Sequence, residues 1–472
     1  MRSRLVLMAA CSALAACQLA PAYRQPDLPV AEQFDSAEAP TPEGSHLATE
    51  IAWPAFFGDP QLRFLIAAAL AHNRDLAASV ARIEQARALY RIRQAERLPQ
   101  VNASGGVTRT EAPLGSFDPE FADSSTTVTF NQYNVQAVMT SFELDFWGRV
   151  KNLSEAARRR YLATVEAQQA FRLSLISNVA ATYYAIRAGE EGIELAERTV
   201  KSRQYALEIA KLRLDAGVTS KVDYEQAAIL VTQAQTQLAE LQRSTGQLRN
   251  QLTILVGGPL AGPLPAGRSI EDPGQFGELD AGLPSALLTH RPDIRQAEQQ
   301  LRAADADIGA ARADFFPRIA LTGSYGYASS ELSELFDRDK RSWTVGGLIS
   351  LPIFDGGQRR AQLGQAQARR DELVASYQRA VQTAFSEVSD ALIGRQRYKE
   401  QIAAQERAVE AQQRLAETAE LRYQNGISIY LEVVDARRNL FSAEQQLIQL
   451  RATALQNGVS LYVALGGGSE AR

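Results

Sequence analysis

The distribution of proline limits what this chain of 472 residues can fold into more than any other feature. Its 18 prolines are confined to a few segments, and none occurs between Pro119 and Pro259 or after Pro352. The two proline-free tracts are rich in Ala, Gln, Glu, Arg and Leu, which favour helices. Since proline inside a helix breaks or kinks it, its absence over such lengths predicts unusually long helices.

The first tract predicts one helix from about Gly148 to Asp215. At about 1.5 Å per residue such a helix is about 100 Å long, far beyond an ordinary globular helix. It must therefore pack along neighbouring helices as a coiled-coil-like pair. Gly217 and Gly426 each follow a long helical stretch and predict turns that fold each tract back on itself.

Four short segments lack charged residues, namely 98–108, 124–142, 319–330 and 342–354. Three of them alternate apolar and polar residues with a period of two, which predicts β-strands. We expect strands at about 98–110, 124–142, 318–330 and 342–354. Strands of about ten residues cross a bilayer when tilted, although one soluble four-stranded sheet packed on helices is the alternative.

The residues within and between these segments also bear on register, loops and strand ends. In the segment 124–142 the alternation slips near Gln132, so its register is left open. The connectors 109–123 and 331–341 carry charges and predict exposed hairpin loops. Pro99 and Pro317 are expected to mark the changes from helix to strand, because proline ends a helix. The returns from strand to helix are expected at glycines, which are Gly148, Gly356 and Gly357.

The N-terminus is typical of a bacterial export signal. Arg2 and Arg4 precede a short apolar stretch, and Leu14-Ala15-Ala16-Cys17 resembles the lipoprotein box, in which the cysteine becomes the lipidated first residue. We predict a lipoprotein signal peptide at 1–16 and lipidation of Cys17; an ordinary signal peptide with a chance cysteine is the alternative. By resemblance to lipoproteins, Gln18 rather than Asp after the cysteine favours the outer membrane. A single lipid anchor binds a bilayer weakly.

Composition argues against several classes of protein. The longest apolar run after the signal is eight residues, at 64–71, whereas a spanning helix needs about 20. A formal net charge of −4 without a basic patch gives no support for nucleic-acid binding. The sequence has no common catalytic motif and no cysteine pair with metal spacing, so we expect neither an enzyme, nor a metal, nor a cofactor. His72 and His290 each precede an aspartate by three residues and are better explained by capping or packing than by a duplicated site.

The chain is an internal duplication. Residues 208–238 align with 417–447 at an offset of 209, and nine of the 31 positions are identical, including Gly217 and Gly426. Each half is predicted to run helix, strand, loop, strand, long helix, turn, helix. The expected divisions of the chain are a signal peptide 1–16, an extended N-terminal segment 17–60, a first repeat 61–258, a Pro/Gly-rich linker 259–283, a second repeat 284–467 and a tail 468–472.

This arrangement, together with several local motifs, resembles the TolC-type outer-membrane efflux proteins, and in particular the lipoprotein branch with OprM-like and NodT-like channels. The resemblance covers about residues 23–467. The motifs that carry it are Asn73-Arg74-Asp75-Leu76, Phe142-Glu143-Leu144-Asp145-Phe146-Trp147-Gly148-Arg149, His290-Arg291-Pro292-Asp293-Ile294, Ile308-Gly309-Ala310-Ala311-Arg312-Ala313 with Phe315-Phe316-Pro317, Pro352-Ile353-Phe354-Asp355-Gly356-Gly357, and Tyr430-Leu431-Glu432-Val433-Val434-Asp435-Ala436.

The resemblance implies an α+β membrane protein and a homotrimer. Its twelve-stranded transmembrane β-barrel would continue into a long α-helical barrel in the periplasm. The implied function is a passive exit duct of a tripartite efflux pump, with a periplasmic adaptor and an inner-membrane pump of the resistance-nodulation-division type as partners. The outer-membrane component of a type I protein secretion system is the alternative. A coiled-coil periplasmic adaptor would explain the helices but not four uncharged strands of bilayer length.

The resemblance also implies a gate at the periplasmic turns. Leu431, Asp435 and Arg438 are spaced to share one helix face, and in OprM-like relatives the matching positions line the closed constriction. The positions of Glu432 and Asp435 match acidic rings in TolC. Tyr423 and Asp223 match a Tyr–Asp link that holds the TolC gate closed. An arginine that supplements this link in TolC is Ser428 here, so this sequence departs from the TolC pattern at that position.

Overall fold

The computed structural model describes residues 19–31, 46–48, 51–114, 127–259, 262–272, 274–277, 279–280 and 290–467. Cys17, the predicted signal peptide and the predicted tail 468–472 lie outside these residues. The chain forms two compact units, each assembled from separate stretches of sequence. The first unit comprises 1–26, 83–164 and 297–376, and the second comprises 27–82, 165–296 and 377–472.

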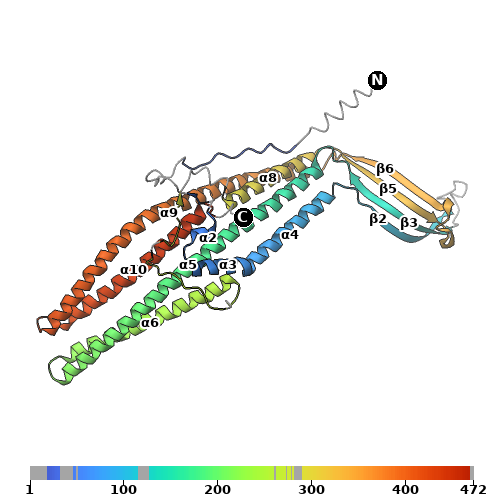
Figure 1. Ribbon diagram of the computed structural model, residues 1–472. Helices are drawn as coiled ribbons and strands as arrows, with labels where there is room; N and C mark the ends of the chain where they lie inside the picture. The colour runs from blue at the N-terminus through green and yellow to red at the C-terminus, as the bar shows by residue number, and fades with distance from the viewer. Residues whose placement is uncertain are drawn as a thin grey trace. The chain divides into compact units, whose positions relative to one another are not determined.

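Long helices account for most of the described chain (Figure 1). The helices are α2 (Trp53–Phe56), α3 (Pro60–His72), α4 (Arg74–Ala95), α5 (Arg149–Asp215), α6 (Lys221–Val256), α8 (Pro292–Ala313), α9 (Gln358–Gln424) and α10 (Tyr430–Ala464). The two longest, α5 and α9, each contain 67 residues, and α5 confirms the helix expected up to Asp215. Within the described residues, no helix combines the length and the apolar character that crossing a membrane requires.

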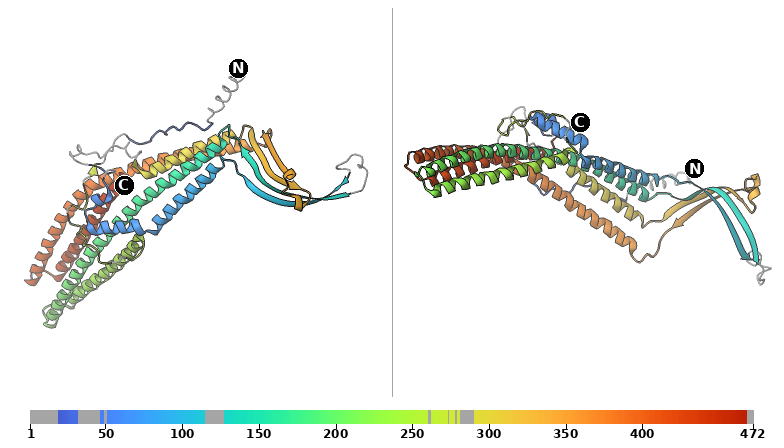
Figure 2. Two further views of the ribbon diagram at one scale, coloured as in Figure 1. Left: turned by 45° about the vertical axis from the view of Figure 1, so that its right-hand side comes forward. Right: turned by 90° about the horizontal axis from the view of Figure 1, so that it is seen from below.

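The first unit contains one antiparallel sheet of four strands, which is curved (Figure 2). Its strands are β2 (Asn102–Pro113), β3 (Thr127–Glu143), β5 (Arg318–Ser329) and β6 (Arg341–Ser350). They lie in the order β2-β3-β5-β6, so the hairpin of one repeat pairs with the hairpin of the other through β3 and β5. Among the described residues of this chain, β2 and β6 each pair on one side only.

Two strand boundaries differ from the prediction. Residues 98–101 precede β2, which continues instead to Pro113 through residues expected to form a loop. Residues 351–354 follow β6, which ends at Ser350. Pro99 and Pro352 explain both ends, because proline has no N–H to donate to a strand ladder. The charges of Arg109 and Glu111 do not prevent pairing, since both lie at the loop end of the hairpin.

The register of β3 also corrects the prediction. Gln132 pairs with Thr108 within an uninterrupted β2–β3 ladder, so no slip occurs there. The irregularity lies between Met139 and Phe142, where β3 contains one residue more than β5 opposite it. Such an extra residue is a β-bulge, which bends the strand and re-aims its side chains. The sequence pattern near Gln132 reflects polar side chains on both faces rather than a backbone shift.

The connections between helices and strands contain the expected prolines and glycines. Pro317 directly precedes β5, and Pro99 lies in the link between α4 and β2. Gly148 precedes α5 with a φ of 74°, and Gly356 and Gly357 precede α9 with φ values of 62° and 89°. Positive φ is strained for other residues, so glycine permits these returns. The indole N–H of Trp147 donates to the Pro317 carbonyl oxygen at 2.9 Å and links the connections of the two repeats.

An extended N-terminal segment lies along α8 in the first unit. The Leu19 carbonyl accepts a hydrogen bond from Arg312 Nη1 at 3.0 Å, near the end of α8. The Tyr23 ring lies 4.4 Å from the Arg302 guanidinium carbon and packs against the cluster of Leu301, Ala304 and Leu373. We call residues 19–26 the N-terminal strap. These contacts fix the strap to α8 at Arg302 and at Arg312.

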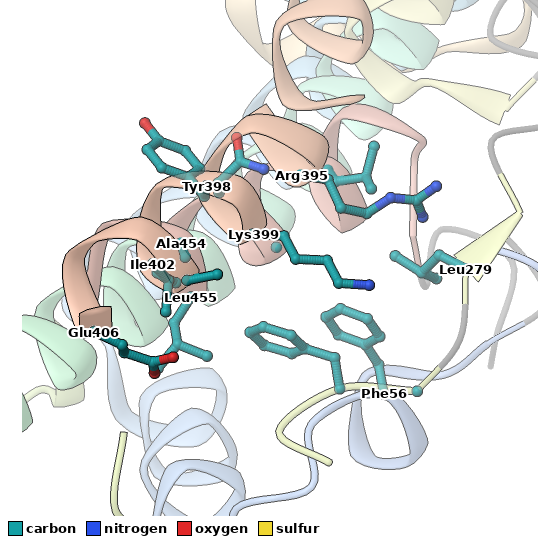
Figure 3. A pocket seen from close by; sticks show the side chains of 15 residues that line it. Phe56, Leu279, Arg395, Tyr398, Lys399, Ile402, Glu406, Ala454 and Leu455 are labelled. Carbon is teal, nitrogen blue, oxygen red and sulfur yellow. The ribbon is translucent and has the colours of Figure 1, made fainter. Parts of the chain in front are cut away.

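The second unit has an aromatic core. The Phe56 ring stacks on Phe276 and on Tyr462, with centroids 5.1 Å and 4.1 Å apart. Phe57 and Tyr184 contact the same group edge-on. Phe56 also borders a cavity between this core and the helices α9 and α10 (Figure 3).

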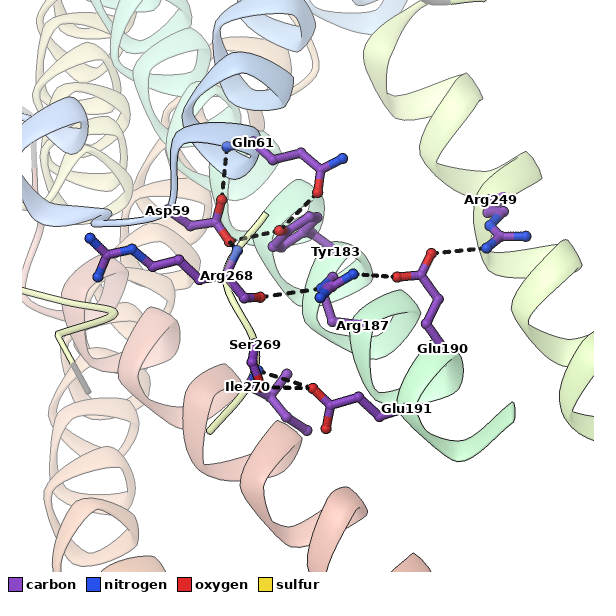
Figure 4. Close-up of polar contacts among 10 residues, drawn as sticks. All are labelled: Asp59, Gln61, Tyr183, Arg187, Glu190, Glu191, Arg249, Arg268, Ser269 and Ile270. Atoms are coloured by element: carbon purple, nitrogen blue, oxygen red, sulfur yellow. Dashed lines mark hydrogen bonds and ion pairs between the residues drawn. The ribbon is translucent and has the colours of Figure 1, made fainter. Parts of the chain in front are cut away.

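A buried carboxylate fixes the linker between the repeats to this core (Figure 4). Asp59 Oδ1 accepts from the backbone N–H groups of Gln61 and Leu62 at the start of α3, at 2.7 Å and 3.2 Å. Its Oδ2 accepts from the Tyr183 hydroxyl at 2.7 Å and from the Arg268 N–H at 2.9 Å. Four hydrogen bonds satisfy a carboxylate that burial would otherwise make costly.

Candidate functional site

The sheet of the first unit presents two chemically different faces, because cross-strand partners point to the same side. One face is apolar and aromatic; we call it the apolar face. It comprises Ala103 and Val107 of β2, Tyr133, Val135, Ala137 and Met139 of β3, Ile319, Leu321, Tyr325 and Tyr327 of β5, and Trp343, Val345 and Ile349 of β6.

The opposite face carries mostly hydroxyl and amide groups; we call it the polar face. It includes Asn102, Ser104 and Thr108 of β2, Gln132, Asn134 and Gln136 of β3, Thr322 and Ser324 of β5, and Ser342 and Thr344 of β6. Charged residues occur only near strand ends, at Arg109, Glu111, Glu143, Arg318 and Arg341. An apolar face beside an uncharged polar face is the pattern of a strand with lipid on one side and water on the other.

Aromatic residues border the apolar face. Tyr325, Tyr327 and Trp343 lie toward the loop end of β5 and β6, and Trp343 is 71% exposed. Trp147 and Phe316 lie at the helix end, where their rings stack at 4.7 Å. Tyrosine and tryptophan concentrate at membrane–water interfaces, where an apolar ring meets a polar surface. The two aromatic groups therefore bracket the uncharged part of the sheet.

The helix hairpins of the second unit end in two equivalent turns. Gly217 and Gly426 have φ values of 69° and 74°, which glycine adopts without strain. The N–H of Val218 donates to the Arg213 carbonyl at 2.9 Å, and the N–H of Ile427 donates to the Arg422 carbonyl at the same distance. This bond, from just beyond the turn back into the last helical turn, closes both helices in the same way.

The predicted gate residues lie just beyond the second turn, on the exposed side of α10. Leu431, Asp435 and Arg438 share this side, whereas Val433, Val434 and Ala436 are buried on the other. Arg438 Nη2 donates to Asp435 Oδ1 at 2.6 Å, so the acidic group has a cationic partner within its own helix. Glu432 lies 3.9 Å from Arg422 Nε on α9.

In this structure Tyr423 and Asp223, the two residues of the implied Tyr–Asp link, contact other partners. Among the described residues no hydrogen bond joins Tyr423 to Asp223, although both border one cavity of about 510 Å³ between the turns. The Asp223 carboxylate accepts a hydrogen bond from the Thr219 hydroxyl instead. The backbone N–H of Asp223 donates to Ser220 Oγ. Thr219 is the favoured partner of the Asp223 carboxylate because it is only four residues away in sequence, so this hydrogen bond requires no tertiary contact.

Tyr423 connects the two repeats through its ring. The Arg213 guanidinium of α5 lies over that ring at 4.7 Å, and the Tyr430 ring lies 5.0 Å away. Tyr430 belongs to a buried cluster with Ala227 and Leu230 of α6, and the partly buried Tyr423 packs against that cluster. A cation over an aromatic ring is worth about 0.5–2 kcal/mol, depending on burial. The sequence gives no local signal for Arg213, because its partner is in the other repeat.

Two further arginines near the turns were missed by sequence reasoning. Arg437 donates to Glu420 Oε2 on α9 and to Ser202 Oγ on α5, both at 3.0 Å. Arg203 is buried and donates to the Leu230 carbonyl at 2.9 Å. Burial, together with the positive charge of Arg437, lowers the pKa of the Arg203 guanidinium. Arginine spaced through a charged helix gives no pattern that distinguishes these two from solvent-exposed ones.

A family model described as outer membrane efflux protein matches residues 65–258 and 283–467. The solvent efflux pump outer membrane protein SrpC of Pseudomonas putida is 41% identical over 425 residues, which cover 89% of this chain and 88% of that protein. Outer membrane protein OprJ of Pseudomonas aeruginosa is 38% identical over 418 residues, covering 89% and 86%.

A solved structure agrees with these relatives. The open state of the MtrE outer membrane channel of Neisseria gonorrhoeae superimposes with a TM-score of 0.85 at 36% sequence identity. The match covers 96% of this chain and 98% of that one. The relatives and this structure are named as efflux proteins and channels rather than as enzymes.

Proposed function

This chain belongs to the outer membrane efflux protein family, and from that premise we propose that it forms the outer-membrane channel of a tripartite efflux pump. The channel is a passive duct, through which compounds delivered by an inner-membrane pump leave the cell across the periplasm and the outer membrane. The observation that carries this proposal is the four-stranded sheet with one apolar face, one uncharged polar face and two open edges.

The open edges argue for assembly of several copies into a closed barrel, and the resemblance to the efflux family implies that their number is three. In lipid, the unpaired N–H and C=O groups of β2 and β6 would each be costly, and a closed barrel removes them. Membrane barrels begin at about eight strands, which one copy of this sheet cannot supply. Three copies supply twelve strands, and β2 of one copy runs antiparallel to β6 of the next. The apolar face then meets lipid and the polar face lines the lumen.

The hairpin turns supply a docking surface for a periplasmic adaptor. Val218 and Ile427 occupy equivalent positions after the two glycines, and they are 65% and 70% exposed. Leu212 and Leu421, each in the last part of the helix that precedes its turn, form a second exposed pair. A duplicated apolar surface of this kind is a site for protein association. The adaptor would connect these turns to an inner-membrane pump of the resistance-nodulation-division type, which supplies the energy.

The same end of the second unit would hold the gate. Three copies of Leu431, Asp435 and Arg438 around a narrow pore would block by size and by dewetting, and the acidic ring would favour cations. The Arg213–Tyr423 contact is the proposed fastening of the closed form, in place of a Tyr423–Asp223 hydrogen bond. An adaptor opens such a gate by binding the open form more tightly than the closed form.

Lipidation of Cys17 would anchor the chain beside the sheet. Cys17 precedes Leu19 by two residues, and Leu19 is held to Arg312, which lies six residues before β5 begins. The N-terminal strap would therefore deliver the lipid near the membrane surface. Replacement of Cys17 by Ser should abolish labelling by a fatty-acid analogue while trimers persist. Labelling that survives the replacement removes this proposal.

Electrical recording from purified protein tests the channel directly. The protein is expected to migrate as a heat-sensitive trimer on denaturing gels and to give discrete single-channel currents in planar bilayers. Protein that remains monomeric in every mild detergent and carries no current would contradict the proposed function.

A further inference from the structure

A cavity of about 600 Å³ lies in the second unit, and no described residue of the hairpin turns lines it. One wall is formed by α9 and α10, and the other by the aromatic core and the short strand β4 (Leu279–Asp280). Binding sites for small molecules have volumes of about 300–1,000 Å³, so this one is large enough for an organic ligand. Neither the exit duct nor the proposed gate uses it.

The interior of the cavity is apolar, and stacked aromatic rings form part of its wall. Phe56, Phe276, Ile402, Leu455 and Leu461 line it. The rings of Phe56 and Phe276 stack on each other, which gives the cavity a rigid aromatic wall. Gly458 of α10 permits this approach, since a Cβ atom there would lie 2.5 Å from the Phe276 ring. A flat or flexible apolar body would find a preformed surface here.

Two cations of α9 stand at the same cavity. Arg395 and Lys399 are one helical turn apart, and both line it. Figure 3 shows the Lys399 side chain extending toward Phe56 and the Arg395 guanidinium toward Leu279. Neither has an ion-pair partner in the part of the chain that the structure describes.

Glu406, the one acidic side chain among the described residues that line the cavity, is already paired. Glu406 Oε1 accepts from Arg451 Nη2 at 2.9 Å. It is also separated from Lys399 by almost two helical turns along α9. Among the described residues that line the cavity, the charge at the Arg395 and Lys399 end is therefore positive.

We propose that this cavity is a binding site for an amphipathic organic anion. The apolar body of the ligand lies against Phe56, Phe276 and Ile402, and its carboxylate, sulfonate or phosphate group accepts hydrogen bonds from Arg395 and Lys399. Hydrogen bonds between ions are among the stronger contacts that proteins make to such groups. The site is separate from the exit duct, so it stands or falls independently of the proposed channel.

A matched pair of fluorescent probes distinguishes the two halves of the site. Anilinonaphthalene sulfonate has an aromatic body and one anionic group, and phenylnaphthylamine has a similar body without charge. Both are titrated into the full-length protein in a non-ionic detergent, after subtraction of the signal from empty micelles. Trp53, three residues before Phe56, serves as an energy donor, so light absorbed by it reports probe bound nearby.

The variants separate charge from shape. Replacing both Arg395 and Lys399 by Ala should weaken sulfonate binding by about tenfold or more and leave the uncharged probe unchanged. Ala403→Trp adds bulk at an exposed position of the cavity wall and should abolish binding of both probes. Trp53→Phe should remove the energy transfer without changing binding measured by direct excitation.

A control variant removes the same charge from α9 elsewhere. Arg379 and Arg407 are exposed and outside the cavity, and their double replacement by Ala should bind both probes as the parent does. If sulfonate binding falls equally in this control, the loss reflects the net charge of the protein rather than Arg395 and Lys399, and the proposed site is wrong. Binding that persists in the Ala403→Trp variant would also contradict the proposed site. The same holds if the parent protein binds neither probe because another copy or another segment of the chain fills the cavity.

Discussion

The two hairpin turns have the same backbone and different fastenings. Gly217 and Gly426 adopt the same left-handed conformation, and the same backbone bond closes the helix before each. The helix after the first turn begins at Ser220, whose hydroxyl accepts from the Asp223 N–H at 3.2 Å. The helix after the second turn begins at Ile429, which offers no cap and is 66% exposed.

The contacts behind the turns differ in the same sense. Arg203 joins α5 to α6 by its hydrogen bond to the Leu230 carbonyl. The equivalent position of the second repeat is Gln412, whose Oε1 is buried without a hydrogen-bond partner among the described residues. Duplication has thus preserved the turn while the side chains that secure it have diverged. The second hairpin, which carries the proposed gate, is instead joined by the ion pair of Arg437 on α10 with Glu420 on α9.

The largest effect is expected at Tyr423, which joins the second hairpin to the first. Tyr423→Ala removes the ring beneath Arg213 and the contact with Tyr430, so it should raise the open probability of single channels at least severalfold. Tyr423→Phe keeps both ring contacts and loses a hydroxyl that bonds neither Asp223 nor any other described residue, so it should behave like the parent. If both changes raise the open probability equally, the hydroxyl of Tyr423 rather than its ring holds the gate closed.

A smaller effect is expected from the charges of the second hairpin. Asp435→Ala leaves Arg438 without its partner, so the constriction becomes more positive and should lose its cation preference and its block by multivalent cations. Arg438→Ala should change selectivity in the opposite direction. Reversal potentials at low salt measure both, because screening hides such charges at high salt. If neither replacement changes selectivity, these side chains do not face the pore.

The smallest effect is expected from exchanging the caps. Ile429→Ser supplies the second hairpin with the cap of the first, and Ser220→Ala removes it from the first; each changes local stability by about 1 kcal/mol. Hydrogen exchange at the start of α10 should slow by about fivefold in the first variant, and exchange at the start of α6 should accelerate by a similar factor in the second. No change at either site would show that the caps do not set the difference between the hairpins.

The sequence predicted what depends on local pattern. The lengths of α5 and α9 follow from helix-forming residues without proline. The four strands follow from four uncharged segments, three of which alternate. The bulge near Met139 was missed because it is a relation between two strands, and one strand's alternation does not contain it. The Arg213–Tyr423 contact was missed because it joins distant parts of the chain through packing. Arg395 and Lys399 could not be distinguished by sequence from the other exposed cations of α9, because only the fold places them beside the cavity.

The central claim is that the sheet crosses the outer membrane with the hairpin turns in the periplasm. Single cysteines at Asp337, in the loop between β5 and β6, and at Val218 and Ile427, beyond the two turns, test it with a membrane-impermeant maleimide. Asp337→Cys should be labelled on intact cells, and Val218→Cys and Ile427→Cys only after the outer membrane is permeabilised. Labelling of the turns on intact cells, with the loop protected, would contradict the account.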